Sequence, residues 1–235
     1  MKNLLLEKTF RVLELAASAE KPVSLKQLSE ATAIPPSTLS RIAADLVEAG
    51  YLSRSGPRRF EPAPGLILLG QNALYNSPLP HVANPLIRSR AESLGVNGAL
   101  AGMQNGQLVY LYRSDLYGPD QINGMPCRVP PGRSYIALAI LVMENGADEG
   151  ADRFLQLESR RLPEAQVHHL AASVAEHGYL HQVEENGCWN ICFPIEYRRA
   201  FYGISLYGRK GQGGSPDRLL FEAALLTSKI RNALS

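Results

Sequence analysis

Four small polar or basic residues, Ser37, Thr38, Ser40 and Arg41, fall within one short stretch of the N-terminal part of the chain. Hydroxyl groups and a guanidinium group can hydrogen-bond to the base edges of DNA or to nearby phosphates. Arg41 is the best candidate for reading a base, because arginine can donate two hydrogen bonds to one guanine. These residue types indicate nucleic-acid recognition.

Three arginines follow closely, at Arg54, Arg58 and Arg59. Their guanidinium groups can bind phosphates, which would fix the register of the protein on a duplex without reading its sequence. The alternatives are that the surface is simply solvated or that it binds a protein. Charge does not decide between them, because the net charge is only +2, with its small positive excess in residues 1–64.

Apolar spacing predicts the helices that would carry these groups. A first helix is expected over 2–18, and its apolar face is expected to comprise Leu6, Phe10, Leu13 and Ala17. Ser24 and Gln27 have the spacing of a capping box, which predicts a short second helix over 25–32. Pro36 can occupy the first turn of a third helix, because the missing N–H would have no partner there.

The third helix is expected over 36–49. Its apolar stripe is predicted to consist of Leu39, Ile42, Ala43, Leu46 and Val47, which leaves the polar group around Arg41 toward solvent. Gly50 ends the helix, and residues 51–61 predict a strand, a turn and a second strand. This order is that of a winged helix-turn-helix, whose third helix can fit the major groove.

The same residues resemble the DNA-binding domain of the IclR family of bacterial regulators. The resemblance is carried by Leu-Glu-Leu at 13–15, Ser-Leu-Lys-Gln-Leu at 24–28, Ile-Pro-Pro-Ser-Thr-Leu-Ser-Arg at 34–41 and Leu-Val-Glu-Ala-Gly-Tyr-Leu at 46–52. It continues more weakly through 132–137, 176–179, 187–195 and 203–206, so it covers most of the chain.

The resemblance implies a winged helix-turn-helix domain (1–62), a linker helix (63–78) and a GAF-like effector-binding domain (79–235). It also implies double-stranded operator DNA and a small-molecule effector as partners, and a homodimer or tetramer. The chain departs from the family pattern in its second domain, where it is shorter around 184–187. Gln182 stands where an acidic residue is usual, and Asn190 and Tyr207 replace smaller residues.

The linker region is apolar and bounded by prolines. Pro62 and Pro64 end the wing, a short helix is expected to carry apolar residues, and a break is expected at 77–80. The apolar residues of that helix are Leu66, Ile67, Leu69, Gly70 and Leu74. Such a helix needs cover, either from its own domains or from the same helix of a second chain.

The remaining sequence alternates between strand and helix patterns. Helices are predicted over 81–94, 135–144, 152–157, 163–177 and 216–234, and strands over 97–103, 108–113, 179–184, 188–196 and 201–207. Asn105 and Gly106 predict a tight hairpin between the first two strands. Together these elements predict an α+β domain, and hence an α+β chain with a winged helix at its N-terminus.

Small polar residues recur on one face of the predicted strands, which suits a metabolite pocket. The candidate effector-binding residues are Ser134, Asn190, Cys192, Ser205 and Tyr207. The resemblance supports all of them except Cys192. Each could equally be an ordinary buried hydrogen-bonding residue.

A rival arrangement consists of His177, His181, Cys188 and Cys192, because imidazole and thiolate groups at such separations can bind zinc. Alternation along a strand would also place such residues in a core or pocket, and the sequence favours that interpretation. We therefore expect no metal site. The chain has three cysteines, Cys127, Cys188 and Cys192. They have no disulfide-framework spacing and suit a reducing compartment.

Enzyme motifs are absent from the sequence: it has no Gly-x-Ser-x-Gly elbow, no phosphate-binding Gly-x-x-x-x-Gly-Lys and no His-Glu-x-x-His. We therefore expect no catalytic residues and no cofactor. The longest apolar run, 136–143, is too short to cross a membrane, and Glu7 and Lys8 come too early for a secretory signal. A cytoplasmic regulator is the expected class.

Overall fold

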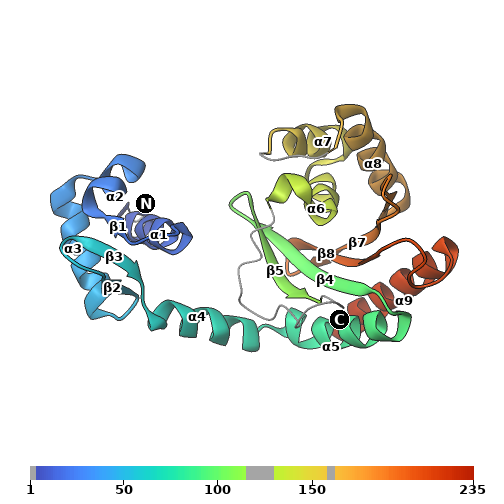
Figure 1. The fold of residues 1–235 in the computed structure, drawn as a ribbon, viewed down its shortest axis with the longest axis horizontal. Coiled ribbons are helices and arrows are strands. Elements are labelled where there is room, and N and C mark those ends of the chain that lie inside the picture. Colours follow the sequence, from blue (N-terminus) through green and yellow to red (C-terminus); the bar gives the residue numbers. More distant parts are fainter. Residues whose placement is uncertain (1–3, 115–129, 158–161) are drawn as a thin grey trace. The chain divides into compact units, whose positions relative to one another are not determined.

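The computed structural model describes residues 4–114, 130–157 and 162–235 (Figure 1). The chain divides into two compact units, Met1–Ala73 and Leu74–Ser235. The first unit has one hydrophobic core and the second has two, one on each face of its sheet. None of the helices described is both long enough and apolar enough to span a membrane.

The first unit is a winged helix-turn-helix, as predicted. Its elements are α1 (Leu4–Ser18), β1 (Val23–Ser24), α2 (Leu25–Thr32), α3 (Pro36–Glu48), β2 (Leu52–Arg54), β3 (Arg59–Pro62) and most of α4 (Pro64–Tyr75). The three strands form an antiparallel sheet in the order β1-β3-β2. Strand β1 has no signal in the sequence, because its two residues are defined only by long-range pairing, Val23 with Phe60 and Ser24 with Arg59.

The capping box at the start of α2 is confirmed. The Ser24 hydroxyl accepts a hydrogen bond from the backbone N–H of Gln27, and Gln27 Oε1 accepts one from the backbone N–H of Ser24. At the other end, Ala33 has a φ of 55°, the left-handed conformation that ends many helices. The turn between α2 and α3 therefore has defined geometry at both of its ends.

The expected apolar face of α1 is wrong. Leu6 and Phe10 are 54% and 55% exposed, whereas Val12 and Ala16 are buried in the core of the unit. The helix carries apolar residues on more than one side, so helical spacing alone admits two stripes, and the shorter side chains make the core contact. Of the predicted residues, Leu13 packs partly against the core, whereas Leu6 and Phe10 form an exposed apolar surface.

The apolar stripe of α3 was predicted correctly. Leu39, Ile42, Ala43 and Leu46 are buried, and Val47 is half-buried. The residues between them therefore face away from the core.

In α4 no residue is buried, and Ile67, Leu68 and Leu69 are each more than half exposed. The break predicted at 77–80 is present but shorter, because α4 ends at Tyr75, Ser77 is the N-cap of α5 and Pro78 is the first residue of α5 (Pro78–Leu94). Proline is compatible with a first helical turn, whose N–H groups have no intrahelical acceptor.

The second unit is a five-stranded antiparallel sheet covered by helices on both faces. After α5 its elements are β4 (Asn97–Gln104), β5 (Gln107–Arg113), a 3₁₀ turn (Pro131–Arg133), α6 (Tyr135–Asn145), α7 (Ala147–Leu155), α8 (Glu164–His177), β6 (Leu180–Val183), β7 (Trp189–Tyr197), β8 (Ala200–Gly208) and α9 (Pro216–Leu234). The strand order is β5-β4-β8-β7-β6. Helices α6, α7 and α8 cover one face, and α5 and α9 cover the other (Figure 1).

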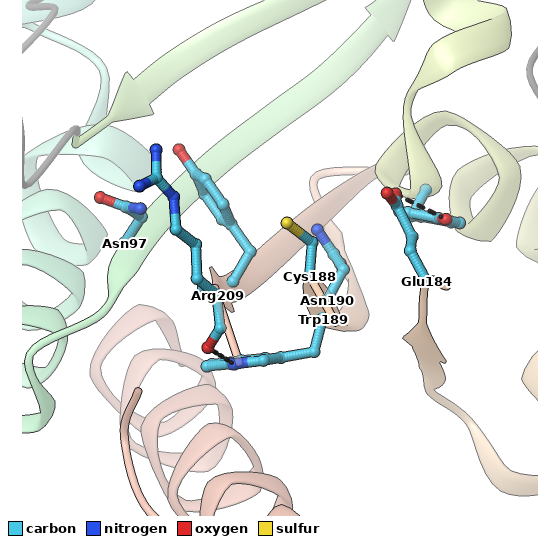
Figure 2. A pocket seen from close by; sticks show the side chains of 9 residues that line it. Asn97, Glu184, Cys188, Trp189, Asn190 and Arg209 are labelled. Atoms are coloured by element: carbon cyan, nitrogen blue, oxygen red, sulfur yellow. Dashed lines mark hydrogen bonds between the residues drawn. The ribbon is translucent and has the colours of Figure 1, made fainter. Parts of the chain in front are cut away.

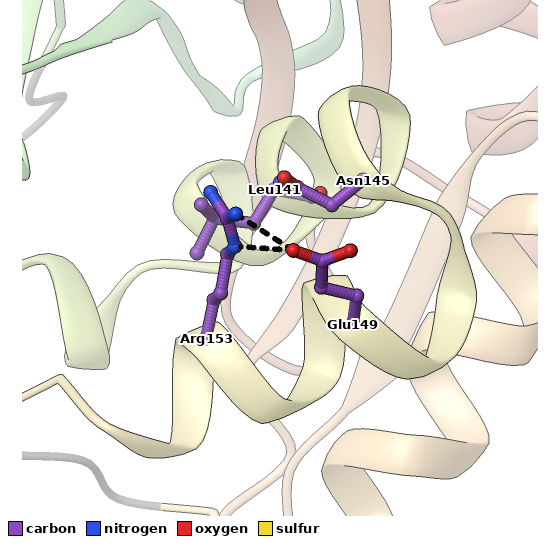
Figure 3. A network of polar contacts seen from close by, with 4 residues as sticks. All are labelled: Leu141, Asn145, Glu149 and Arg153. Carbon is purple, nitrogen blue, oxygen red and sulfur yellow. Dashed lines mark hydrogen bonds and ion pairs between the residues drawn. The ribbon is translucent and has the colours of Figure 1, made fainter.

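Residues 147–155 form α7, so the helix predicted over 152–157 is misplaced. The first half of α7 was not predicted as helical, because Gly146 and Gly150 lie there and glycine disfavours helices. A Cβ atom at Gly150 would lie 2.6 Å from the Cα atom of Val142, so only glycine allows α7 to pack this closely on α6. Figure 3 shows the polar contacts at this corner, where Asn145 Nδ2 donates to the Leu141 carbonyl and Arg153 pairs with Glu149.

Two hairpins of the sheet turn through residues with positive φ. Asn105 and Gly106 (51° and 72°) join β4 to β5, which confirms the predicted hairpin. The turn between β7 and β8 instead uses Arg198 and Arg199, with φ values of 51° and 63°. This conformation is unfavourable for side chains that have a Cβ atom.

Candidate functional site

The first candidate surface is the outer face of α3. Ser37, Ser40 and Arg41 are exposed and Thr38 is half-buried, all within the first two turns of the helix. The acidic Asp45 and the acidic Glu48 lie toward the other end. The structure therefore brings the four predicted contact residues together at the N-terminal end of the helix, where the side chains are small and polar or basic.

The start of α3 also offers backbone donors. Pro35 occupies the N-cap position and provides no side-chain hydrogen bond to the helix. The N–H groups of the first turn, after the Pro36 nitrogen, are therefore not capped by a side chain. A helix N-terminus of this kind attracts phosphates through its N–H groups and its dipole.

The three wing arginines are all exposed but differ in their surroundings. The guanidinium of Arg59 donates a hydrogen bond to the Pro22 carbonyl at 3.1 Å. The guanidinium carbon of Arg54 lies 5.5 Å from the centre of the Phe60 ring. Within the described part of the chain, no hydrogen bond or ion pair holds the side chain of Arg58. Arg58 is thus the wing arginine whose charge is most available.

The second candidate site is a pocket of about 250 Å³ in the second unit, at the end of the sheet where β7 begins and β8 ends (Figure 2). It lies just below the usual size range of small-molecule sites, so it suits a small metabolite. Its lining residues are Asn97, Tyr135, Glu184, Cys188, Trp189, Asn190, Tyr207, Gly208 and Arg209.

Two of the five predicted effector residues, Asn190 and Tyr207, line this pocket. They are paired on neighbouring strands and point to the α6 face of the sheet. Ser205 is buried behind them, and its hydroxyl donates a hydrogen bond of 2.9 Å to Asn190 Oδ1. Ser205 can therefore act on a ligand only through the orientation of Asn190.

The other two predicted residues do not line the pocket. Ser134 is buried at the N-terminus of α6. Cys192 is fully buried in the core beneath α6, and this burial raises the pKa of its thiol far above the usual value. A neutral thiol in that position fills core space.

Tyr207 is held from behind by β5 and the residue after it. Its hydroxyl donates to the Ser114 carbonyl at 2.9 Å and accepts a hydrogen bond from Arg113 Nε at 3.2 Å. The Ser114 hydroxyl in turn accepts from the backbone N–H of Gly98. The Tyr207 ring is therefore a fixed wall of the pocket.

The opposite wall contains a hydrogen bond between Tyr135 and Glu184. The Tyr135 hydroxyl donates to Glu184 Oε1 at 3.1 Å. Burial raises the pKa of Tyr135, and the negative charge of Glu184 and this hydrogen bond raise it further. Tyr135 therefore remains a hydrogen-bond donor at the pocket wall.

Sequence reasoning missed Asn97, Tyr135, Glu184 and Arg209. Each lies at or just beyond the end of a helix or strand. Strand alternation, the signal that found Asn190 and Tyr207, does not operate at these ends.

The four rival metal ligands are not brought together. Leu180 pairs with Cys192 and His181 with Ile191, so His181 and Cys192 point to opposite faces of the sheet. Among the described residues no group of three or more histidines, cysteines or acidic residues is arranged to hold a metal ion. Cys127 lies outside the described residues.

Comparisons with known proteins found a family model that matches part of the first unit and solved structures that match both units. A family model of the IclR helix-turn-helix domain matches residues 5–56. The probable transcriptional regulator SauR of Cupriavidus necator is 26% identical over 125 residues, covering 52% of this chain and 50% of that protein. The match therefore spans about half the length of this curated relative.

Solved structures resemble the chain over almost its whole length. An IclR homologue from Microbacterium hydrocarbonoxydans, complexed with 4-hydroxybenzoate, has a TM-score of 0.67 at 20% identity and covers 98% of both chains. An IclR family transcriptional regulator from Brucella abortus has a TM-score of 0.76 at 17% identity, covering 98% of this chain and 92% of that one. These structures share the fold. The chain therefore has an IclR helix-turn-helix domain over residues 5–56, and it shares its two-domain fold with these solved IclR structures.

Proposed function

We propose that the protein binds operator DNA in the cytoplasm in a sequence-specific manner and that a small metabolite in the second unit controls this binding. The observation that carries the proposal is the exposure of Ser37, Ser40 and Arg41 on the first turns of α3. The opposite face of the helix is buried, so the helix is held rigidly with these groups outward. A helix presented in this way can enter the major groove.

The contacts divide between sequence reading and positioning. Arg41 donates to base edges, with Ser37, Thr38 and Ser40 contacting bases or nearby phosphates. Arg58 binds the phosphate backbone from the wing, and Arg54 and Arg59 add positive charge beside it. The uncapped N–H groups at the start of α3 support a further phosphate contact.

The exposed apolar surface of the first unit supports self-association. Leu5, Leu6 and Phe10 on α1 and Ile67, Leu68 and Leu69 on α4 are each half or more exposed. Water-exposed apolar side chains in such number favour burial against a partner. We propose that the partner is a second copy, which would align two α3 helices on a pseudo-palindromic operator. Pairs of such dimers would form a tetramer.

The pocket beside Asn190 and Tyr207 is the proposed effector site. It is lined by both polar and aromatic groups, as small-molecule sites are. The homologue from Microbacterium hydrocarbonoxydans was crystallised with 4-hydroxybenzoate, which supports a small organic ligand here. Such a ligand regulates only if its affinity differs between the DNA-competent arrangement and the incompetent one.

Selection of bound fragments from the genomic DNA of the source organism, followed by metabolite challenge, tests the proposal. The full-length protein should retain a small set of fragments that share a pseudo-palindromic sequence, and at least one metabolite should change their retention. Retention of fragments without sequence preference would contradict the proposal. So would a specific operator whose occupancy no metabolite changes, because effector control would then be absent.

A further inference from the structure

The pocket has opposite charges at its two ends. Arg209 and Asn97 lie at one end and Glu184 at the other, with Cys188 and Asn190 between them (Figure 2). The strand order explains this placement. Asn97 begins β4, Arg209 follows β8, and Glu184 follows β6, which is separated from β8 by β7. Since neighbouring strands lie about 5 Å apart, the positive and negative ends are about 10 Å apart at the backbone.

The negative end is held in place by hydrogen bonds within the protein. Tyr135 donates to one carboxylate oxygen of Glu184 at 3.1 Å, and Asn186 Nδ2 donates to the other at 3.2 Å. Each carboxylate oxygen has a second lone pair, so Glu184 can still accept from a ligand. An ammonium or hydroxyl group would satisfy it, whereas a ligand carboxylate would be repelled.

At the positive end, hydrogen bonds hold the backbone of Arg209 in place. The Arg209 carbonyl accepts a hydrogen bond from the indole N–H of Trp189, and the Arg209 N–H donates to Gln212 Oε1. The backbone that carries the guanidinium is therefore fixed at the pocket mouth. The Asn97 amide beside it can donate to an anion. A ligand carboxylate fits this end and an ammonium group does not.

We propose, on the basis of the effector site assigned above, that the ligand of this pocket is a small dipolar molecule. It has a carboxylate at the Arg209 and Asn97 end and an ammonium or other hydrogen-bond donor at the Glu184 end. The pocket volume of about 250 Å³ limits it to a compact molecule, such as an amino acid or a short amino-substituted acid. The Tyr207 ring, on the strand that leads into Arg209, provides an apolar surface beside the carboxylate end of the molecule.

Three aromatic probes that share one benzene ring test this assignment by calorimetric titration of the full-length protein. 4-(Aminomethyl)benzoate carries both charges, benzoate only the negative one and benzylamine only the positive one. The dipolar probe should bind at least about five-fold more tightly than either single-charge probe, since each partly exposed charge contact contributes about 1 kcal/mol.

Charge-neutralising variants assign each end. Glu184→Gln should remove the preference for 4-(aminomethyl)benzoate over benzoate, and Arg209→Gln should remove its preference over benzylamine. Glu185→Gln and Lys210→Gln are matched controls, because these neighbouring exposed residues do not line the pocket. Both controls should keep the wild-type preferences.

Equal affinity for the three probes, no measurable binding of any of them, or unchanged preferences in Glu184→Gln would overturn the dipolar assignment. The proposed function fails by a different result, the absence of a specific operator or of any metabolite that affects its occupancy. A specific operator released by an uncharged or purely anionic metabolite would therefore retain the regulator and reject the dipolar ligand.

Discussion

The hydroxyl of Ser205 donates a 2.9 Å hydrogen bond to Oδ1 of Asn190, so a fully buried side chain sets the orientation of an amide that lines the pocket. The two residues lie on adjacent strands, two register positions apart, since Asn190 pairs with Tyr207 and Ser205 with Cys192. The pocket surface is thus determined partly by residues that a ligand never touches.

A double-mutant cycle measures this contact. Ser205→Ala should lower the free energy of unfolding by about 1 kcal/mol, because Asn190 Oδ1 loses a buried donor. In the Asn190→Ala background the same substitution should cost less, and the difference is the coupling energy. Urea unfolding of the four proteins provides the test. Full additivity would show that the hydrogen bond contributes nothing to stability.

Arg198 and Arg199 provide a test of backbone strain. Both have positive φ in the turn between β7 and β8, where asparagine and glycine are favoured. Replacing them together with Asn and Gly should raise the free energy of unfolding by about 1 kcal/mol or more. Placing arginines at Asn105 and Gly106, which have the same turn conformation, should lower it comparably.

The matched control for that experiment replaces Arg198 and Arg199 with glutamine, which removes the charges but keeps the Cβ atoms. This variant should remain close to wild type in urea unfolding. If the glutamine variant gains as much stability as the Asn-Gly variant, charge repulsion rather than backbone conformation is the cause.

His181 gives the protein a pH-dependent stability. Burial lowers the pKa of His181 in the folded protein, and the charge of Asp217 opposes this effect only partly. The unfolded chain therefore takes up a proton at higher pH than the folded one, near the ordinary value of 6.5. The stability contribution is complete above pH 6.5 and is lost as the pH falls below it.

Urea unfolding midpoints between pH 8 and pH 5 measure this effect. The midpoint of the wild-type protein should fall as the solution is acidified through pH 6.5, and His181→Asn should show a smaller fall. A variant with the same pH profile as wild type would show that other groups cause the acid destabilisation.

The sequence predicted best those elements whose patterns are local and unambiguous. The α3 stripe, the capping box at Ser24 and the Asn105-Gly106 hairpin each depend on residues a few positions apart, and all are confirmed. The face of α1 was assigned wrongly because Leu6 and Phe10 compete with Val12 and Ala16 for the core. That choice depends on what the rest of the unit packs against the helix.

The residues of the candidate pocket also differ in how well the sequence predicts them. Asn190 and Tyr207 follow strand alternation and could be found from sequence. Glu184 and Arg209 line the same pocket only because the sheet places β6, β7 and β8 side by side. Cys192 alternates correctly but lies deeper along the same face, beneath α6. Alternation identifies the face of a strand, and the covering helices decide which part of that face stays open.

The most direct test of the account measures operator binding by fluorescence anisotropy over a range of salt concentrations, for wild type and single variants. Arg41→Ala should weaken binding to the selected operator by about 1–3 kcal/mol and reduce discrimination against altered operators. Arg58→Ala should weaken binding to all sequences and reduce the slope of log K against log salt by about one. Arg153→Ala, an exposed arginine paired with Glu149 in the second unit, should bind like wild type. If Arg41→Ala and Arg58→Ala both retain wild-type affinity and selectivity, the exposed turns of α3 and the wing are not the DNA-binding surface.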